Sequence, residues 1–151
     1  MRAVLLAGLC LSVVTAGQVR PDFSGRWMPV SPPEIVGDAR QAVTITQTAT
    51  TLTMSHPSEG GSHSITYNLD GSDRRTTLDA HGRIDIVASA KWEGARLVLR
   101  EVRSGTHDEK STDVRYVMWL DDQGQLVFDL TEPGPDGKPR TTKAIFRRMV
   151  P

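Results

Sequence analysis

The sequence predicts an all-β protein, a single antiparallel up-and-down β-barrel of about 8–10 strands. Apolar and polar residues alternate with a period of two through most of the chain, as they do over 43–48. Turn-forming pairs such as Asp70-Gly71 and Glu93-Gly94 separate these segments at short intervals. No segment has the length and periodicity of a crossover helix, which excludes a parallel α/β sheet. The regular short spacing is typical of a barrel or a sandwich.

The first predicted strand is 22–27, in which Phe23, Gly25 and Trp27 share one face. The following segment, 28–40, contains three prolines, and proline lacks the amide donor that a strand ladder requires. We therefore expect a long loop there.

The other predicted strands each carry one apolar face and one face rich in threonine or charge. They are 43–48, 51–55, 64–69, 84–92, 97–99, 114–120, 126–130 and 144–148. The segments 56–61, 121–124 and 133–139 are predicted as turns or loops. The charged, glycine-containing segment 101–110 is predicted as an exposed hairpin end.

The composition fits one globular domain. The chain has 151 residues, and its 38% of hydrophobic and 24% of charged residues exclude a disordered or membrane-embedded protein. Because 18 Lys and Arg residues balance 18 Asp and Glu residues, no basic field gathers phosphates. We expect no nucleic-acid partner.

The N-terminus has the pattern of an export signal. Arg2 precedes an apolar stretch, 3–14, that is too short to span a bilayer as a helix, and small residues follow up to Ala16. The expected domains are a signal peptide over 1–16 and a mature barrel over 17–151, located in the periplasm or secreted and not transmembrane. The alternative, a buried N-terminal helix, is disfavoured because 17–21 continues no helical pattern.

The single cysteine, Cys10, lies inside this signal. A lipid-anchored cysteine follows a small residue, whereas Cys10 follows Leu9, which disfavours a lipoprotein. The mature chain is therefore expected to contain neither a disulfide nor a thiol nucleophile.

Gly25-Arg26-Trp27 resembles the Gly-x-Trp motif of the calycins, which comprise lipocalins, fatty-acid-binding proteins and their relatives. The resemblance implies that Trp27 seals one end of the barrel beneath an arginine from near the end of the chain. Arg147 and Arg148 are the candidates, and Arg148 fits the inward row better. A guanidinium over an indole gains cation–π attraction while its donors bind carbonyls. The expected closure residues are Gly25, Trp27 and Arg148.

Two further segments extend the resemblance over 22–149. The segment 112–116 is similar to the Thr-Asp-Tyr segment of lipocalins, with Val114 in place of the tyrosine. Trp92-Glu93-Gly94-Ala95-Arg96-Leu97 matches a pattern of small exported bacterial domains that begin Asp-Phe-Ser-Gly-x-Trp. Because the sequence ends just after the last predicted strand, without the C-terminal helix of true lipocalins, it is similar to a lipocalin-like relative.

The expected function is non-enzymatic binding of a small apolar or amphipathic ligand inside the barrel. The candidate lining residues are Ile65, Tyr67, Ile86, Leu99, Tyr116, Met118 and Phe128. A dry void of about 300 Å³ would cost roughly 7 kcal/mol. The pocket is therefore small, wet or occupied, or side chains fill the barrel. The alternative is a packed barrel that binds or inhibits a protein through the loops 28–40 and 133–139.

Catalytic and metal-binding patterns are missing from the sequence. The four histidines lie in or beside predicted turns without a metal-ligand spacing, and no serine has a nucleophile-elbow context. We expect no enzyme activity, metal or cofactor. One alternative stays open, the assembly of His63, Asp79 and His81 at a barrel mouth.

Overall fold

The computed structural model describes residues 19–30, 41–58, 61–78, 84–105 and 111–150. The predicted signal peptide with Cys10, most of the proline-rich loop and the residues Asp79, His81 and His107 lie outside this part of the chain. No helix within the described residues is long and apolar enough to cross a membrane.

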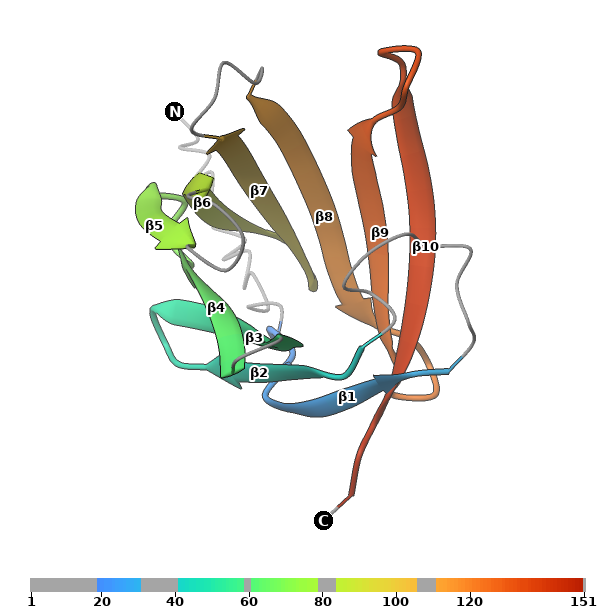
Figure 1. Ribbon diagram of the computed structural model, residues 1–151. Coiled ribbons are helices and arrows are strands. Elements are labelled where there is room, and N and C mark those ends of the chain that lie inside the picture. The colour runs from blue at the N-terminus through green and yellow to red at the C-terminus, as the bar shows by residue number, and fades with distance from the viewer. Residues whose placement is uncertain (1–18, 31–40, 59–60, 79–83, 106–110, 151) are drawn as a thin grey trace, which may run out of the picture.

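The described residues form ten strands (Figure 1). They are β1 (Gly25–Pro29), β2 (Val43–Gln47), β3 (Thr51–Ser58), β4 (Gly61–Asn68), β5 (Arg74–Leu78), β6 (Ile84–Glu93), β7 (Arg96–Gly105), β8 (Thr112–Leu120), β9 (Leu126–Pro133) and β10 (Pro139–Arg148).

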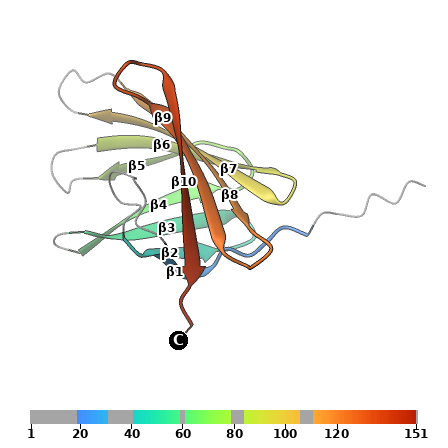
Figure 2. The same cartoon turned by 90° about the vertical axis from the view of Figure 1, so that its right-hand side faces the viewer.

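All ten strands belong to one antiparallel sheet in the order β4-β3-β2-β1-β10-β9-β8-β7-β6-β5. The first strand thus pairs with the last, with Trp27 opposite Arg148. Figures 1 and 2 show the sheet wrapping around until its edge strands, β4 and β5, lie beside each other. No ladder joins these two strands in the described chain, so we call their junction the seam. The predicted all-β antiparallel barrel is confirmed.

The structure corrects several local predictions. Met28 and Pro29 were expected in the long loop but belong to β1, and residues 22–24, expected in the first strand, precede it. β5 was absent from the expected strands because Arg74–Leu78, a mostly exposed edge strand, has no apolar alternation. His56–Ser58 and Gly61 were assigned to a turn but belong to β3 and β4, which pair His56 with His63. The segment 101–105 was assigned to an exposed hairpin end but continues β7.

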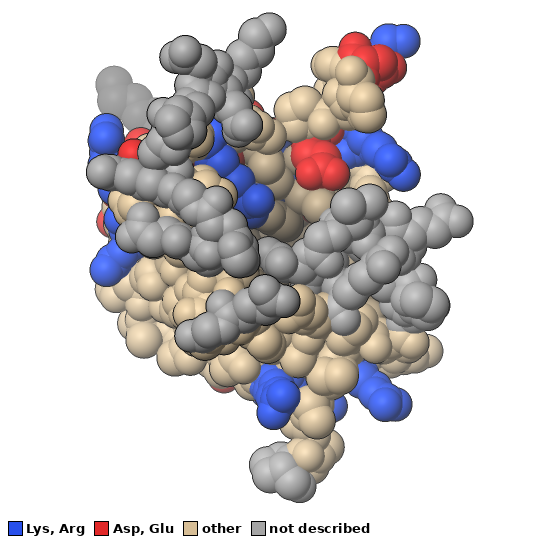
Figure 3. All heavy atoms as spheres, viewed as in Figure 1, with Lys and Arg blue, Asp and Glu red and all other residues tan. Residues whose placement is uncertain are grey.

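Among the described residues, the interior is packed at one end and becomes progressively exposed toward the other. Successive inward-facing pairs across β9 and β10 are Leu126–Phe146, Phe128–Ala144, Leu130–Thr142 and Glu132–Arg140. The first two pairs are buried, the third is half-buried and the fourth is exposed. Figure 3 shows the surface hollowed beside the β9–β10 hairpin, at the upper right. The barrel is therefore a cup whose floor is the packed end beside β1.

Candidate functional site

The closed end is built around Trp27, which is fully buried. Its Nε1 donates a hydrogen bond to the carbonyl of Phe23 at 2.9 Å. The guanidinium carbon of Arg148 lies 4.6 Å from the centroid of the indole. Arg148 Nη1 and Nη2 donate to the carbonyls of Ser24 and Asp22 at 2.6 and 3.1 Å. One side chain thus covers the indole and fixes the segment before β1.

Gly25 permits this arrangement because its backbone has a φ of 138°, which side chains rarely adopt. A Cβ atom at this position would lie 3.3 Å from Arg148 Nη1. Arg147 pairs with Met28 and lies on the opposite face of β10, exposed to solvent.

Gln47, which no sequence pattern indicates, connects the N-terminal segment to β2. Its Oε1 accepts from the amide of Phe23, and its Nε2 donates to the carbonyl of Pro21, both at 3.1 Å. The ring of Phe23 stacks on Trp92 of β6 with 5.8 Å between centroids. These contacts pack the N-terminal segment against the closed end of the barrel.

All seven predicted lining residues lie on the inner face of the sheet. Register places Tyr116 between Leu99 and Leu130, and Met118 beside Phe128. Six of the seven are buried in the core, and Tyr116 is half-buried against it. The structure therefore brings these residues together, most of them as packed core.

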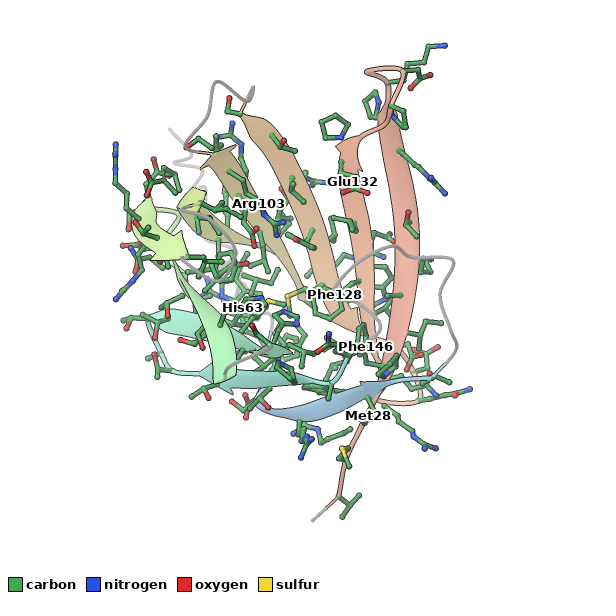
Figure 4. All side chains as sticks on the ribbon, viewed as in Figure 1. Met28, His63, Arg103, Phe128, Glu132 and Phe146 are labelled. Atoms are coloured by element: carbon green, nitrogen blue, oxygen red, sulfur yellow. The ribbon has the colours of Figure 1, made fainter. Side chains whose placement is uncertain are left out.

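Four interior side chains form a hydrogen-bonded group that we call the polar quartet: Tyr67, Glu101, Arg103 and Tyr116. Figure 4 labels Arg103 of this group. The Tyr67 hydroxyl donates to Glu101 Oε1. Arg103 Nε donates to Glu101 Oε2 at 2.7 Å, and Arg103 Nη2 donates to the Tyr116 hydroxyl at 2.9 Å. Because Tyr67 is on β4 and Glu101 is on β7, the quartet also connects β4 to the far side of the seam.

Burial and charge shape the electrostatics of the quartet. Complete burial, followed by the charge of Glu101, raises the pKa of Tyr67 well above its ordinary value. Burial alone would lower the pKa of Arg103, but Tyr116 and Glu101 outweigh it and raise that pKa. Tyr67 is therefore a neutral donor and Arg103 a permanent cation beside the Glu101 carboxylate.

The quartet lies at the boundary between the packed floor and the open part of the cup. Glu101 is 2% exposed, whereas the side chain of Arg103, two residues nearer the open end, is 39% exposed. Arg103 faces Ile86 on one neighbouring strand and Thr112 on the other. A molecule entering the cup meets Arg103 before it meets Glu101.

Glu101 and Arg103 were missed because the charge of the segment 101–110 suggested a hairpin end. A signal for their orientation was present, since they continue the inward row of Leu97 and Leu99 in phase.

Of the histidine site predicted as an alternative at the mouth, only His63 lies within the described residues. His56 and His63 face each other across β3 and β4, with ring centroids 5.4 Å apart. Asp79 and His81 lie outside the described residues. Among the residues that are described, no group of three or more His, Cys, Asp or Glu side chains is placed to hold a metal ion.

A groove of about 300 Å³ lies at the β9–β10 hairpin. It is lined by Arg100, Asp113, Arg115, Thr131, Glu132, Pro133, Gly137 and Pro139. Arg100 and Asp113 form an exposed ion pair there, with Nη2 2.6 Å from Oδ2. Exposed pairs of this kind stabilise a fold only weakly.

Neither a protein-family model nor a curated protein sequence matches the chain. Solved structures do match it. The chain aligns with human cRBP IV at a TM-score of 0.56 and 15% identity, over 85% of this chain and 99% of that one. It aligns with the REP1-NXSQ fatty acid transporter at a TM-score of 0.57 and 12% identity, over 84% and 96% of the two chains.

A third structure, that of the wild-type fluorescent protein UnaG, gives a TM-score of 0.57 and 17% identity over 84% of this chain and 97% of that one. The fold is a lipocalin-like β-barrel. In this barrel the sheet closes between β1 and β10, and the seam lies between β4 and β5. The resemblance noted for Gly25-Arg26-Trp27 is therefore confirmed at the level of the fold.

Proposed function

We propose that the protein is an exported, non-enzymatic binding protein that holds one small amphipathic molecule in the open part of its barrel. The observation that carries the proposal is the change along the inner face, from a packed apolar floor to half-exposed apolar and polar side chains around the quartet. The floor offers apolar surface, while Arg103 and Tyr116 offer polar atoms. Ligand pockets combine these two features.

The cost of a cavity supports this location. A large dry void would remove roughly 24 cal/mol of stability for each Å³. The fully buried side chains at the closed end leave little room for such a void. The described side chains at the other end are exposed, so an unliganded site there is hydrated and avoids that cost. A hydrated cup that a ligand fills reversibly is consistent with the packing of the closed end and with the exposure of the other end.

Two further arguments support binding and export. One structural neighbour is described as a fatty acid transporter, which suggests that this barrel can serve a carrier of amphipathic molecules. The apolar stretch 3–14 after Arg2, with small residues up to Ala16, suggests a removable signal.

Native mass spectrometry of the full chain expressed in bacteria and purified from the periplasm tests both parts. We expect a mature mass that begins at Gly17, together with a discrete extra mass that organic extraction removes. A clean ligand-free mass that takes up nothing from a lipid mixture would overturn the binding proposal and favour a protein partner at the loops. Recovery of the unprocessed chain in the cytoplasm would overturn the export proposal.

A further inference from the structure

The charge of Arg103 is already balanced inside the barrel. Arg103 Nη2 lies 2.6 Å from Glu101 Oε2, and Nε donates to the same oxygen. Because Glu101 is almost completely buried, water screens this carboxylate poorly. A ligand at the quartet therefore meets a neutral ion pair and not an isolated cation.

The ion pair has donors left for a ligand. Arg103 uses Nε and Nη2 for Glu101 and Tyr116, and Nη1 makes no hydrogen bond to any residue that the structure describes. Arginine donates five hydrogen bonds and accepts none. The exposed part of Arg103 is thus suited to a ligand oxygen that needs a donor.

An anionic oxygen in this position gains less from the positive charge than it would from an isolated arginine. It is attracted by Arg103 and repelled by the Glu101 carboxylate bound at Nε and Nη2, and both effects grow as the effective dielectric falls. The repulsion offsets part of the attraction, while the anion still loses its hydration. A hydroxyl, carbonyl or amide oxygen has a much smaller desolvation cost and keeps the hydrogen bond.

We propose that the polar quartet makes this barrel selective for amphipathic molecules with an uncharged polar end and unfavourable to carboxylates of the same chain length. This inference rests on the proposed binding function. It names Glu101 as a specificity-determining residue that acts through Arg103 and does not itself have to touch the ligand.

Isothermal titration calorimetry at pH 7.5 with dodecan-1-ol and dodecanoate tests the inference. The two probes differ in hydration, so the readout is the change in their affinity ratio between variants and not the ratio in one protein. In Glu101→Gln, we expect dodecanoate affinity to rise by about tenfold while dodecanol affinity changes by less than about threefold. Asp113→Asn removes an exposed carboxylate outside the quartet and is expected to leave the ratio unchanged.

One result for folded proteins would overturn the selectivity and leave the binding function standing. It is a ratio of dodecanoate affinity to dodecanol affinity that is unchanged between the wild type and Glu101→Gln. Failure of the wild type to bind either probe, or any component of a lipid mixture, would instead overturn the binding function itself.

A second variant covers the case in which Glu101→Gln does not fold. The double variant Glu101→Gln/Arg103→Gln removes both charges and keeps the site neutral. We expect it to retain the wild-type affinity ratio within about threefold. A loss of dodecanoate binding by tenfold or more in this variant would show that Arg103 attracts carboxylates in the wild type, and the inference would fall.

Discussion

Arg148 lies across the indole of Trp27, with its guanidinium carbon 4.6 Å from the ring centroid. The two residues are opposite each other in the ladder between β1 and β10, so the contact is made where the ends of the chain meet. The same guanidinium donates to two carbonyls of the segment before β1. The closure of the barrel thus depends on backbone pairing and on one cation–π pair.

Trp27→Ala is expected to lower the free energy of unfolding by about 3–5 kcal/mol, because it removes a fully buried large aromatic side chain from the floor. Chemical denaturation followed by circular dichroism measures this change. A loss below about 1 kcal/mol would contradict the role of Trp27 in closing the barrel.

Arg148→Ala is expected to cost about 1–2 kcal/mol through the lost cation–π contact and the two hydrogen bonds. Arg147→Ala is the matched control, since its side chain is exposed on the other face of β10, and we expect a change within about 0.5 kcal/mol. A double-mutant cycle with Trp27→Ala then isolates the contact. Full additivity would show that Trp27 and Arg148 do not interact in solution.

Gly25→Ala is expected to cost about 1–3 kcal/mol, because alanine is strained at a φ of 138° and its Cβ would crowd Arg148. Gly124→Ala is the control, since Gly124 also has a positive φ, 73°, but nothing lies within 4 Å of an added Cβ. We expect the excess cost at Gly25 to shrink in an Arg148→Ala background. If the excess cost persists in the Arg148→Ala background, it comes from backbone strain alone and not from contact with Arg148.

The two tyrosines of the chain, Tyr67 and Tyr116, make the quartet visible to an alkaline titration. The pKa of Tyr67 is raised in the folded protein, so the unfolded chain loses the phenolic proton first as the pH rises. The contribution of Tyr67 protonation to the free energy of unfolding is fully present below a pH of about 10 and is lost as the pH rises above it.

We therefore expect the ultraviolet absorbance of phenolate from Tyr67 to appear only together with unfolding. Tyr67→Phe should remove that late phase and weaken the dependence of the unfolding free energy on alkaline pH. Ionisation of both tyrosines near a pH of about 10 in folded protein would contradict the buried position of Tyr67.

The fold could be predicted because each half-buried strand shows its period in the sequence. Val43 and Ile45 mark β2, and Leu126 and Phe128 mark β9, by the same alternation. β5 could not be found in this way, since an edge strand beside a seam has little apolar surface to bury. Its threonines and arginines are therefore as compatible with a loop as with a strand.

The candidate site could be predicted only in its apolar part. Leu99 and Met118 belong to inward rows that hydrophobicity reveals. Glu101 and Arg103 continue such a row as charged residues, and a charged residue is buried only when a partner compensates it. One such partner is Tyr67, which lies on β4, a strand distant from β7 in the sequence. No local pattern indicates this pairing.

The pairing of β1 with β10 also has a kinetic consequence. One edge of β1 pairs with β2, but its other edge pairs with β10, the last of the ten described strands, so the barrel stays unclosed until the ribosome has completed β10. Contacts of such long sequence separation slow folding, because loop-closure entropy is lost before they form. Until then β1 and β9 each expose an unpaired edge, and such edges make an incomplete chain prone to aggregation and to capture by chaperones.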